Sequence, residues 1–549
     1  MTKYEKLGDQ FAQEGKTLEA IRFYQKAINQ DGKNISSILK LGSQLYNSND
    51  YQAVINHYQK HISSYPNYFE LYYNLGKTYC RLGQYKRALS VFIKAKQLQP
   101  KFLETYLETA SILARLGQLN KAIENSREAI QVNPTSHKVH SNLLFYMNMD
   151  PAYTNEKLFA EYKNWNKLHT QDCVVYDKYL NSLNTEKQIR LAFVSPDLRN
   201  HVVGHIIQPF FKHYDRNRFQ ITCYYNHNSK DQHSEEIRSL VDKWYDVFDL
   251  TNDALAEKIH QEKIDILVDM VGHMNGNRLM AFAQRPAPIQ VTQTGFPNTT
   301  GLSAMDYRIS DFYLDPPGLT DDYHSEKIIR LDSPGILYNP PENSPPVAAA
   351  PFLENGHITF GCLNNYVKVS ELAVKTWSLI LNALPDSKLL LLVAEGEDVT
   401  EALHRRFLKY SISPDRIQPA PLCDRENFLL LHHHVDIALD PFPYTGFFSS
   451  VEALWMGVPV ITISGKNGGE RHGVSIYNYL ERTEWIADSY QEYIRIALKL
   501  AKDKQILQKT RQELRQEVQN SPLIDGQLFT REISKVYSEM WKNWCQSQQ

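Results

Sequence analysis

The stretch VDIALDPFPYTGFFSSVEALWMG (residues 435–457) decides the fold class of this 549-residue chain, together with LNNYVK (residues 363–368) upstream. The apolar run 435–439 has the length of a buried strand, and the prolines that follow it can neither continue a sheet nor begin a helix at once. Ser449 and Ser450 are typical N-caps for a helix that begins after them. The pattern therefore predicts a buried strand, a sharp loop and a helix.

The helix that this loop feeds is a candidate phosphate site. A helix N-terminus carries free N–H groups and a partial positive charge, and nucleotide-binding α/β domains bind phosphate there. Gly446 can adopt backbone angles that other residues avoid, and Glu452 is placed to accept hydrogen bonds from ribose hydroxyls. The alternative is a buried strand–helix corner whose serines only cap the helix, and the local residues leave both interpretations open.

Length and composition narrow the class of protein. The length predicts about three or four domains. With 60 basic and 62 acidic residues the net charge is −2, so no general attraction to nucleic acid or to a membrane surface is indicated. No apolar segment is long enough to span a bilayer, and residues 1–10 lack the apolar core of a signal peptide. The six cysteines form no CxxC pair, which favours free thiols in a reducing cytoplasm.

Residues 1–148 contain a repeat of about 34 residues, the usual period of tetratricopeptide helix–turn–helix units. Most repeat units carry a small residue, an aromatic residue and a closing proline at equivalent positions. The matching positions are Leu7-Gly8, Leu41-Gly42 and Leu75-Gly76; Ala20, Val54, Ala88 and Ala122; Tyr24, Tyr58 and Phe92; and Pro66, Pro100 and Pro134. Such units stack into a superhelix whose concave groove is expected to dock protein chains, with a plain helical spacer as the alternative.

Two regions of alternating strands and helices follow the repeats. After a predicted amphipathic helical linker over 149–187, the alternation runs through 188–340 and, beyond a proline-rich linker over 341–354, through 355–549. This alternation predicts two parallel sheets covered by helices, and thus two Rossmann-like domains with a cleft at the carboxyl ends of the strands. Neither GxGxxG nor GxxxxGK[ST] is present, which disfavours a dinucleotide cofactor.

Several loops place polar side chains where strands end at this cleft. His201 and His205 follow the first strand, and His273 follows a later buried strand, so all three are expected to line the cleft. His201 could act as a general base or hold an acceptor hydroxyl, and bracing the loop is the alternative. Lys368 can reach a phosphate as a point charge. The three histidines at 432–434 cannot converge on one ion, because consecutive helical residues point about 100° apart, and no metal site is predicted.

Besides the repeats, five blocks of the sequence carry a family resemblance: DLRNHVVGH (197–205), LVDMVGHMNGNRL (267–279), RPAPIQVTQTGFPNTTGLSAMDYRISD (285–311), LNNYVKVS (363–370) and DIALDPFPYTGFFSSVEALWMGVPVIT (436–462). Together with the repeats they resemble the O-linked N-acetylglucosamine transferase family, which includes the plant SPINDLY proteins and bacterial relatives. The resemblance implies a tetratricopeptide superhelix followed by a GT-B glycosyltransferase fold of two Rossmann-like domains. It also implies metal-independent, inverting sugar transfer from a nucleotide sugar to Ser or Thr hydroxyls of proteins docked on the repeats.

The resemblance also implies roles for individual residues. His201 matches an active-site histidine, and Lys368 matches a lysine that contacts the diphosphate. Asn365 takes the place of a glutamine near the donor, and Glu452 matches a ribose-binding aspartate. His205 and His273 are expected on the acceptor side. The residues expected to bind the donor are Asn365, Lys368, Gly446, Phe448, Ser449, Ser450 and Glu452.

The chain departs from the family pattern after Gly446, where Phe447 and Phe448 replace the usual Gly or His and Thr residues. These rings could stack on a base or a sugar, or partly fill the donor pocket. UDP-N-acetylglucosamine is the favoured donor, and GDP-fucose and UDP-glucose remain open. The expected function is that of a cytoplasmic protein glycosyltransferase without a cofactor. Sugar transfer to asparagine, O-fucosyl transfer and an inactive repeat scaffold are the alternatives.

Overall fold

The computed structural model describes residues 2–549, which divide into two compact units. One unit runs to Pro134 and also contains Val393–Arg405. The other contains Thr135–Leu392 and Arg406–Gln549. Each unit has a hydrophobic core of its own.

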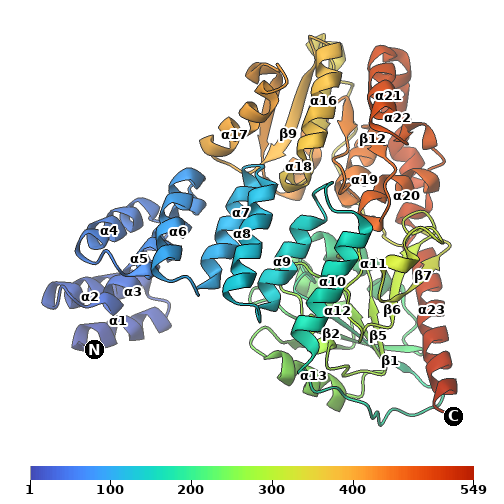
Figure 1. Ribbon diagram of the computed structural model, residues 1–549. Helices are drawn as coiled ribbons and strands as arrows, with labels where there is room; N and C mark the ends of the chain where they lie inside the picture. The colour runs from blue at the N-terminus through green and yellow to red at the C-terminus, as the bar shows by residue number, and fades with distance from the viewer. Residues whose placement is uncertain (1) are drawn as a thin grey trace. The chain divides into compact units, whose positions relative to one another are not determined.

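Paired helices form the repeat array of the first unit (Figure 1). The small and aromatic positions of the repeat touch, as the sequence predicts. A Cβ added to Gly42 would lie 2.1 Å from the Tyr58 hydroxyl, and one added to Gly76 would lie 2.5 Å from the Phe92 ring. The helices are α1 (Lys3–Gln13), α2 (Thr17–Gln30), α3 (Ile35–Asn47), α4 (Tyr51–Ser64), α5 (Phe69–Arg81), α6 (Tyr85–Leu98), α7 (Leu103–Arg115) and α8 (Leu119–Val132).

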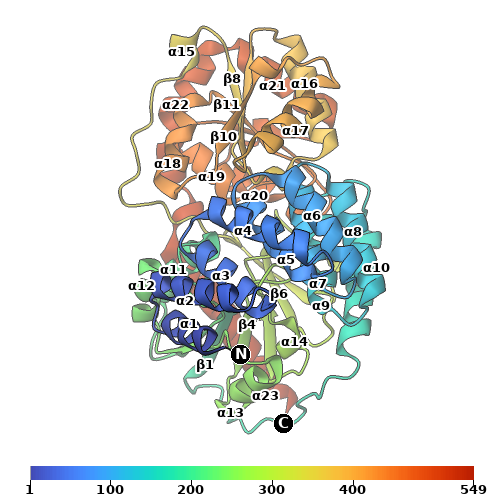
Figure 2. The ribbon, with the colours of Figure 1, turned by 90° about the vertical axis from the view of Figure 1, so that its left-hand side faces the viewer.

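The second unit contains two sheets, and their strands pair in parallel (Figure 2). The first has the order β3-β2-β1-β4-β5-β6-β7, and the second has the order β10-β9-β8-β11-β12-β13. This arrangement confirms two Rossmann-like domains. The strands of the first sheet are β1 (Ile189–Ser195), β2 (Phe219–Tyr225), β3 (Lys243–Asp246), β4 (Ile266–Asp269), β5 (Ile289–Thr292), β6 (Tyr307–Asp311) and β7 (Lys327–Leu331). Those of the second are β8 (Thr359–Cys362), β9 (Lys388–Val393), β10 (Ile417–Pro421), β11 (Ile437–Leu439), β12 (Val460–Ile463) and β13 (Ile486–Ala487).

The remaining helices precede, separate or follow these strands along the chain. They are α9 (His137–Met147), α10 (Asn155–Thr170), α11 (Val202–His213), α12 (Gln232–Leu240), α13 (Asn252–Gln261), α14 (Leu279–Phe282), α15 (Phe352–Asn355), α16 (Glu371–Ala383), α17 (Glu397–Leu408), α18 (Arg425–Leu431), α19 (Phe448–Trp455), α20 (His472–Tyr479), α21 (Tyr490–Lys502), α22 (Lys504–Gln519) and α23 (Gly526–Ser547). None of the helices within residues 2–549 is both long and apolar enough to cross a membrane.

The predicted helical linker over 149–187 is only partly helical. In α10 the buried residues Leu158, Tyr162 and Trp165 recur at the helical period, so they form one buried face of the helix. Beyond Thr170 that period stops, the chain is extended, and apolar side chains such as Leu180 are exposed. The extended part is thus a strap without a buried face of its own.

The last helix does not belong to the second sheet, although the predicted domain 355–549 includes it. Apolar side chains of α23, among them Phe529, Ile533 and Trp541, are buried in the same core as strands β1 and β4 of the first sheet. The helix packs on α11 and lies beside the first sheet in Figure 1. The chain therefore passes from the half with the first sheet to the half with the second sheet and back again. Two connections thus join these halves of the second unit.

Candidate active site

A cavity of about 550 Å³ lies in the second unit. Its wall is formed by residues from the half of that unit that contains the first sheet and from the half that contains the second sheet. The first half supplies the start of α11 and the loop after β5. The second half supplies the loop after β8 and the starts of α18, α19 and α20. Its volume lies within the range of about 300–1,000 Å³ typical of small-ligand sites. The wall includes His201, His205, Asn365, Lys368, Arg425, Phe447, Phe448, Ser449, Glu452 and His472.

The helix predicted as a phosphate site is α19, and its first turn lies at the cavity. The prediction that Ser449 and Ser450 cap this helix is wrong: Phe447 is the N-cap residue and gives no side-chain cap. Ser450 instead donates from Oγ to Asp440 at 3.4 Å. The first amides of a helix have no acceptor within it, so the start of α19 can still bind an anion.

Gly446 is required for its small size rather than for its backbone angles. It is absent from the residues with positive φ in the described chain. A Cβ added there would lie 2.3 Å from Asn364 Nδ2 and 2.5 Å from Ser449 Oγ. Its N–H donates to Asp440 Oδ1 at 2.8 Å. Gly446 therefore lets the loop close tightly over Asp440, and it does not itself line the cavity.

The Asp440 carboxylate holds this loop in place through hydrogen bonds. It is buried and accepts hydrogen bonds from Gly446 N–H and from Thr462 Oγ1, the latter at 2.8 Å. Burial raises the pKa of Asp440, and these hydrogen bonds and the charge of Lys368 oppose the rise. Because the carboxylate connects the end of β11 to the loop and to β12, it holds the start of α19 in place.

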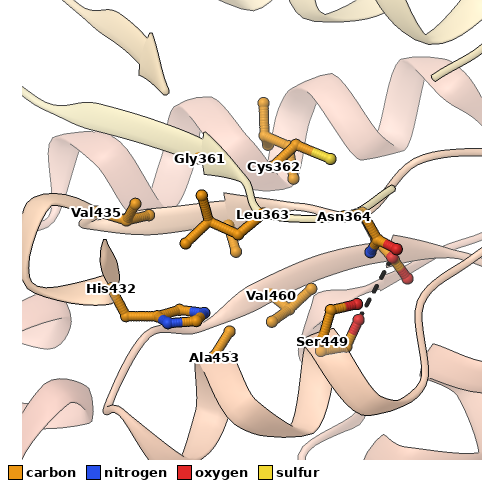
Figure 3. Close-up of a pocket in the computed structure, with 13 residues that line it drawn as sticks. Gly361, Cys362, Leu363, Asn364, His432, Val435, Ser449, Ala453 and Val460 are labelled. Carbon is orange, nitrogen blue, oxygen red and sulfur yellow. Dashed lines mark hydrogen bonds between the residues drawn. The ribbon is translucent and has the colours of Figure 1, made fainter. Parts of the chain in front are cut away.

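A small cavity of about 20 Å³ lies behind this loop, large enough for a water molecule. Figure 3 shows its wall: Cys362, Leu363 and Asn364 at the end of β8, with Ser449 and Ala453 of α19 opposite them. The two segments that the sequence singles out, 363–368 and 435–457, thus meet directly.

Lys368 faces the large cavity from the short 3₁₀ turn η2 (Tyr366–Lys368). Its Nζ donates to the Thr445 carbonyl at 3.0 Å and lies 4.5 Å from the centre of the Tyr444 ring. Burial lowers the pKa of this amine, and the charge of Asp440 opposes that effect. Asn365 lies on the same wall and accepts from Val367 N–H at 3.2 Å, which caps the turn. The turn presents one cation beside the start of α19.

His201 lies on the opposite half of the wall, as the N-cap of α11. Its Nδ1 accepts from Val203 N–H at 3.3 Å and lies 3.7 Å from Asp197 Oδ1. Burial lowers the pKa of His201, Asp197 raises it, and Arg199 lowers it further. An Nδ1 that accepts is unprotonated, so the neutral ring carries its hydrogen on Nε2.

The other two predicted histidines have different surroundings. His205 lines the cavity, with its Nε2 3.1 Å from Asn200 Oδ1, and burial, followed by the charge of Arg425, lowers its pKa to about 3. His273 is buried away from the cavity wall and contacts Ser141 Oγ at 3.0 Å and the Thr300 carbonyl at 2.7 Å. The expectation that His273 lines the cleft is corrected: its ring packs against Tyr162 and Trp165 of α10, and both ring nitrogens have partners away from the cavity wall.

Glu452 is buried at the other end of the wall. Its Oε1 accepts from Arg425 Nε at 2.9 Å, and the Arg425 guanidinium lies 4.9 Å from the centre of the Phe448 ring. Phe448 also packs against Tyr338, with the ring centres 5.2 Å apart. Phe447 and Phe448 therefore form part of the wall and do not fill the cavity. The carboxylate, guanidinium and ring together form a surface suited to a flat polar group such as a base with its ribose.

Glu452 predicts a pH-dependent stability. Burial raises its pKa from 4.5 to about 7, although Arg425 opposes the rise. As the pH rises above 4.5 the unfolded chain ionises first, so the free energy of unfolding loses up to about 3 kcal/mol by pH 7. Glu452→Gln removes this loss. We expect the variant to become more stable relative to the wild type between pH 5 and pH 8, measured by thermal unfolding. Glu426→Gln, on the exposed side of α18, is the control. A stability difference that does not change with pH would contradict a raised pKa.

Three residues at or beside the cavity are not predicted from the sequence as part of a site: Asp440, Arg425 and His472. Asp440 directly follows a buried strand, the same signal that points to His201, and could have been found. Arg425 is separated from Glu452 by 27 positions, and His472 contacts Thr445 across the same separation. Neither pair has a sequence signal. Two of the three adjacent histidines at 432–434 have different partners: His432 contacts carbonyls of α18, and His433 contacts the Pro346 carbonyl.

The chain is similar to known proteins over most of its length. A model of the family described as glycosyl transferase family 41 matches residues 119–334 and 349–533, and a tetratricopeptide repeat model matches residues 68–133. The chain is also similar to the structure of a Thermobaculum terrenum O-GlcNAc transferase mutant, with a TM-score of 0.87, 30% identity, and coverage of 94% of this chain and 99% of that one.

Two plant proteins are among the similar relatives. A Solanum lycopersicum protein named probable UDP-N-acetylglucosamine–peptide N-acetylglucosaminyltransferase SPINDLY is 34% identical over 430 residues, 76% of this chain and 45% of that protein. An Arabidopsis thaliana protein with the same enzyme name, SEC, is 30% identical over 379 residues, 66% of this chain and 38% of that protein. The chain spans less than half the length of these curated relatives. From the match of the family model over most of its length, together with the fold, we conclude that the chain belongs to glycosyltransferase family 41.

Proposed function

We propose that this protein is a glycosyltransferase that moves a sugar from a nucleotide sugar to a Ser or Thr hydroxyl of another protein. The observation that carries the proposal is the cavity of about 550 Å³ whose wall joins Lys368, the start of α19 and His201. The names of the SPINDLY and SEC relatives favour UDP-N-acetylglucosamine as the donor.

The second half of the wall is suited to the donor. Lys368 and the first amides of α19 supply positive charge for the departing diphosphate, and the charge they stabilise is larger in the transition state than in the bound donor. In this proposal Glu452 and Arg425, which pair on the cavity wall, bind the ribose. In this proposal the protein supplies the charge itself, so a chelator such as EDTA is expected to leave turnover unchanged.

The first half of the wall is suited to the acceptor. An acceptor hydroxyl attacks the anomeric carbon from the side opposite the diphosphate, which inverts that centre. His201 carries its hydrogen on Nε2 in the observed geometry. We therefore assign it the role of orienting the hydroxyl by donating a hydrogen bond, with deprotonation by the same ring requiring the other tautomer.

The repeats supply the partner in this proposal. Tetratricopeptide units present a concave surface that binds extended chains, and acceptor proteins would dock there. A reducing, cytoplasmic location is part of the proposal. All six cysteines are free thiols, which fits such a compartment.

The test is a thermal-shift panel of UDP-N-acetylglucosamine, UDP-glucose and GDP-fucose, followed by mass spectrometry of a modified acceptor peptide. A donor at 100 times its Kd stabilises the folded state by about 2.7 kcal/mol. We expect the strongest shift with UDP-N-acetylglucosamine and modification of Ser or Thr. A modified asparagine would replace the proposed acceptor class, and a preference for GDP-fucose would replace the proposed donor. No shift with any nucleotide sugar would favour a repeat scaffold without transferase activity.

A further inference from the structure

The cavity wall carries a third histidine besides His201 and His205, namely His472, which lines the same space as Lys368 and has no role in the mechanism above. His472 is the first residue of α20 and is 5% exposed. The start of this helix is tightly packed, because a Cβ added to Gly473 would lie 2.3 Å from Thr462 Oγ1. The ring is therefore held in a fixed place on the wall.

Thr445 determines which ring nitrogen of His472 carries the hydrogen. The Thr445 hydroxyl has one hydrogen and donates it to the Gly469 carbonyl at 3.0 Å, a group that can only accept. Thr445 Oγ1 therefore accepts from His472 Nδ1, 3.2 Å away. Burial lowers the pKa of His472 to about 3, and the charge of Lys368 acts in the same direction. The ring is neutral near pH 7, with its hydrogen on Nδ1 and a free lone pair on Nε2.

The lone pair on Nε2 has no protein partner. Within residues 2–549, the His472 ring is hydrogen-bonded through Nδ1 to Thr445 Oγ1, and the Gly469 carbonyl, which also acts on the ring, can only accept and so cannot pair with a lone pair. Nε2 is also absent from the fully buried side-chain atoms that lack a partner, so it keeps contact with the solvent of the cavity. An unpaired acceptor on a buried wall is suited to a ligand that brings a donor.

The chemistry of Nε2 excludes the diphosphate as its partner, because phosphate oxygens also only accept. The position of His472 indicates which other group it meets. Thr445 holds His472 through Oγ1 and holds Lys368 through its carbonyl. The ligand group beside His472 is thus next to the diphosphate. The proposed function assigns the ribose to Glu452 and Arg425, which pair elsewhere on the same wall, so the remaining neighbour of the diphosphate is the sugar.

We infer that His472 Nε2 accepts a hydrogen bond from a hydroxyl or amide N–H of the transferred sugar, and so helps to select the sugar. The inference rests on the proposed function, since it needs a nucleotide-sugar donor in this cavity. A sugar that lacks the donor group would leave Nε2 unpaired again, which is how buried polar groups discriminate between ligands.

Two variants, His472→Asn and His472→Gln, test the roles of the two ring nitrogens separately. Asparagine reaches the position of Nδ1 and can still donate to Thr445, but it removes Nε2. Glutamine reaches the position of Nε2 and offers an amide oxygen as the acceptor. Calorimetry would compare the Kd of the best nucleotide sugar of the panel with the Kd of its nucleoside diphosphate. For His472→Asn we expect sugar-nucleotide affinity to fall about 3- to 10-fold with diphosphate affinity unchanged, and for His472→Gln we expect most of the affinity to return.

The outcomes distinguish this inference from the proposed function. Equal loss for both ligands, or no loss for either, would overturn the role of His472 while the donor site stands. A wild-type protein that binds neither ligand would overturn the proposed function and this inference with it. Should His472→Asn fail to fold, nucleotide sugars that lack one hydroxyl at a time can be tested on the wild type. One of them should bind about 3- to 10-fold more weakly, and equal binding of all would contradict the inference.

Discussion

Replacing Lys368 by methionine is expected to lower turnover by about 10²–10³-fold, the usual cost of removing one group that stabilises transition-state charge. Methionine keeps the length of the side chain and removes its cation. The fold should survive, because Lys368 Nζ gives up one hydrogen bond, to the Thr445 carbonyl. The turn that carries it stays anchored by Arg406, which donates to the Tyr366 hydroxyl at 2.7 Å and to the Val369 carbonyl at 2.8 Å. The measurement is kcat at a saturating donor concentration.

The control for this variant is Lys375→Met, on the exposed side of α16, which should leave kcat unchanged. The thermal midpoint of Lys368→Met without ligand should fall less than that of Asp440→Ala, because the variant removes the charge beside Asp440 but leaves the hydrogen bonds that Asp440 accepts from Gly446 and Thr462. Unchanged turnover in Lys368→Met would show that the diphosphate charge is stabilised elsewhere, and the assignment of the cavity as the donor site would then be wrong.

Replacing Asp440 by alanine is expected to destabilise the second unit by about 2–5 kcal/mol. The variant leaves the Gly446 amide without its buried acceptor and takes a negative charge away from Lys368. It also removes the acceptor of Thr462 Oγ1. Since these groups hold the loop before α19, donor binding should weaken together with stability. Thermal unfolding and calorimetry on the same variant measure both effects.

Asp440→Asn is the matched variant. Its amide oxygen can still accept from Gly446, and its NH₂ group can donate to Thr462 once that hydroxyl rotates, so the loss of stability should be smaller than for alanine. Asp386→Ala, at an exposed position, is the surface control. Equal stability of Asp440→Ala and the wild type would contradict the role of Asp440 in holding the loop.

Local patterns in the sequence predict much of this fold. The period of the repeats follows from contacts such as Gly42 with Tyr58, which recur because each unit packs in the same way. The alternation of strands and helices predicts both sheets, because burial on two faces requires continuous apolar strands. The boundaries are less accurate: β11 begins at Ile437, later than expected, and the linker helix ends at Thr170.

The candidate site is predicted in part. The phosphate loop, Lys368 and His201 follow strands directly, and parallel strands bring their carboxyl ends to one edge of a sheet. This topology places Lys368 and the phosphate loop together at one edge of the second sheet, whereas His201 follows β1 of the first sheet and reaches the same cavity through the packing of the two halves. The position of His273 does not follow from the topology, because whether a residue after a strand faces the cleft or the packing beneath α10 depends on side chains of distant helices.

The sequence alone determined the order of the modules, the two parallel sheets and the loop ahead of α19, since these depend on periods and residue types within short stretches. The tertiary structure decided which side chains meet: Lys368 with Thr445 across 77 positions, and α23 with the core of the first sheet. It also decided that Thr445 places the hydrogen of His472 on Nδ1. Such contacts depend on packing between elements far apart in the chain, and no local period records them.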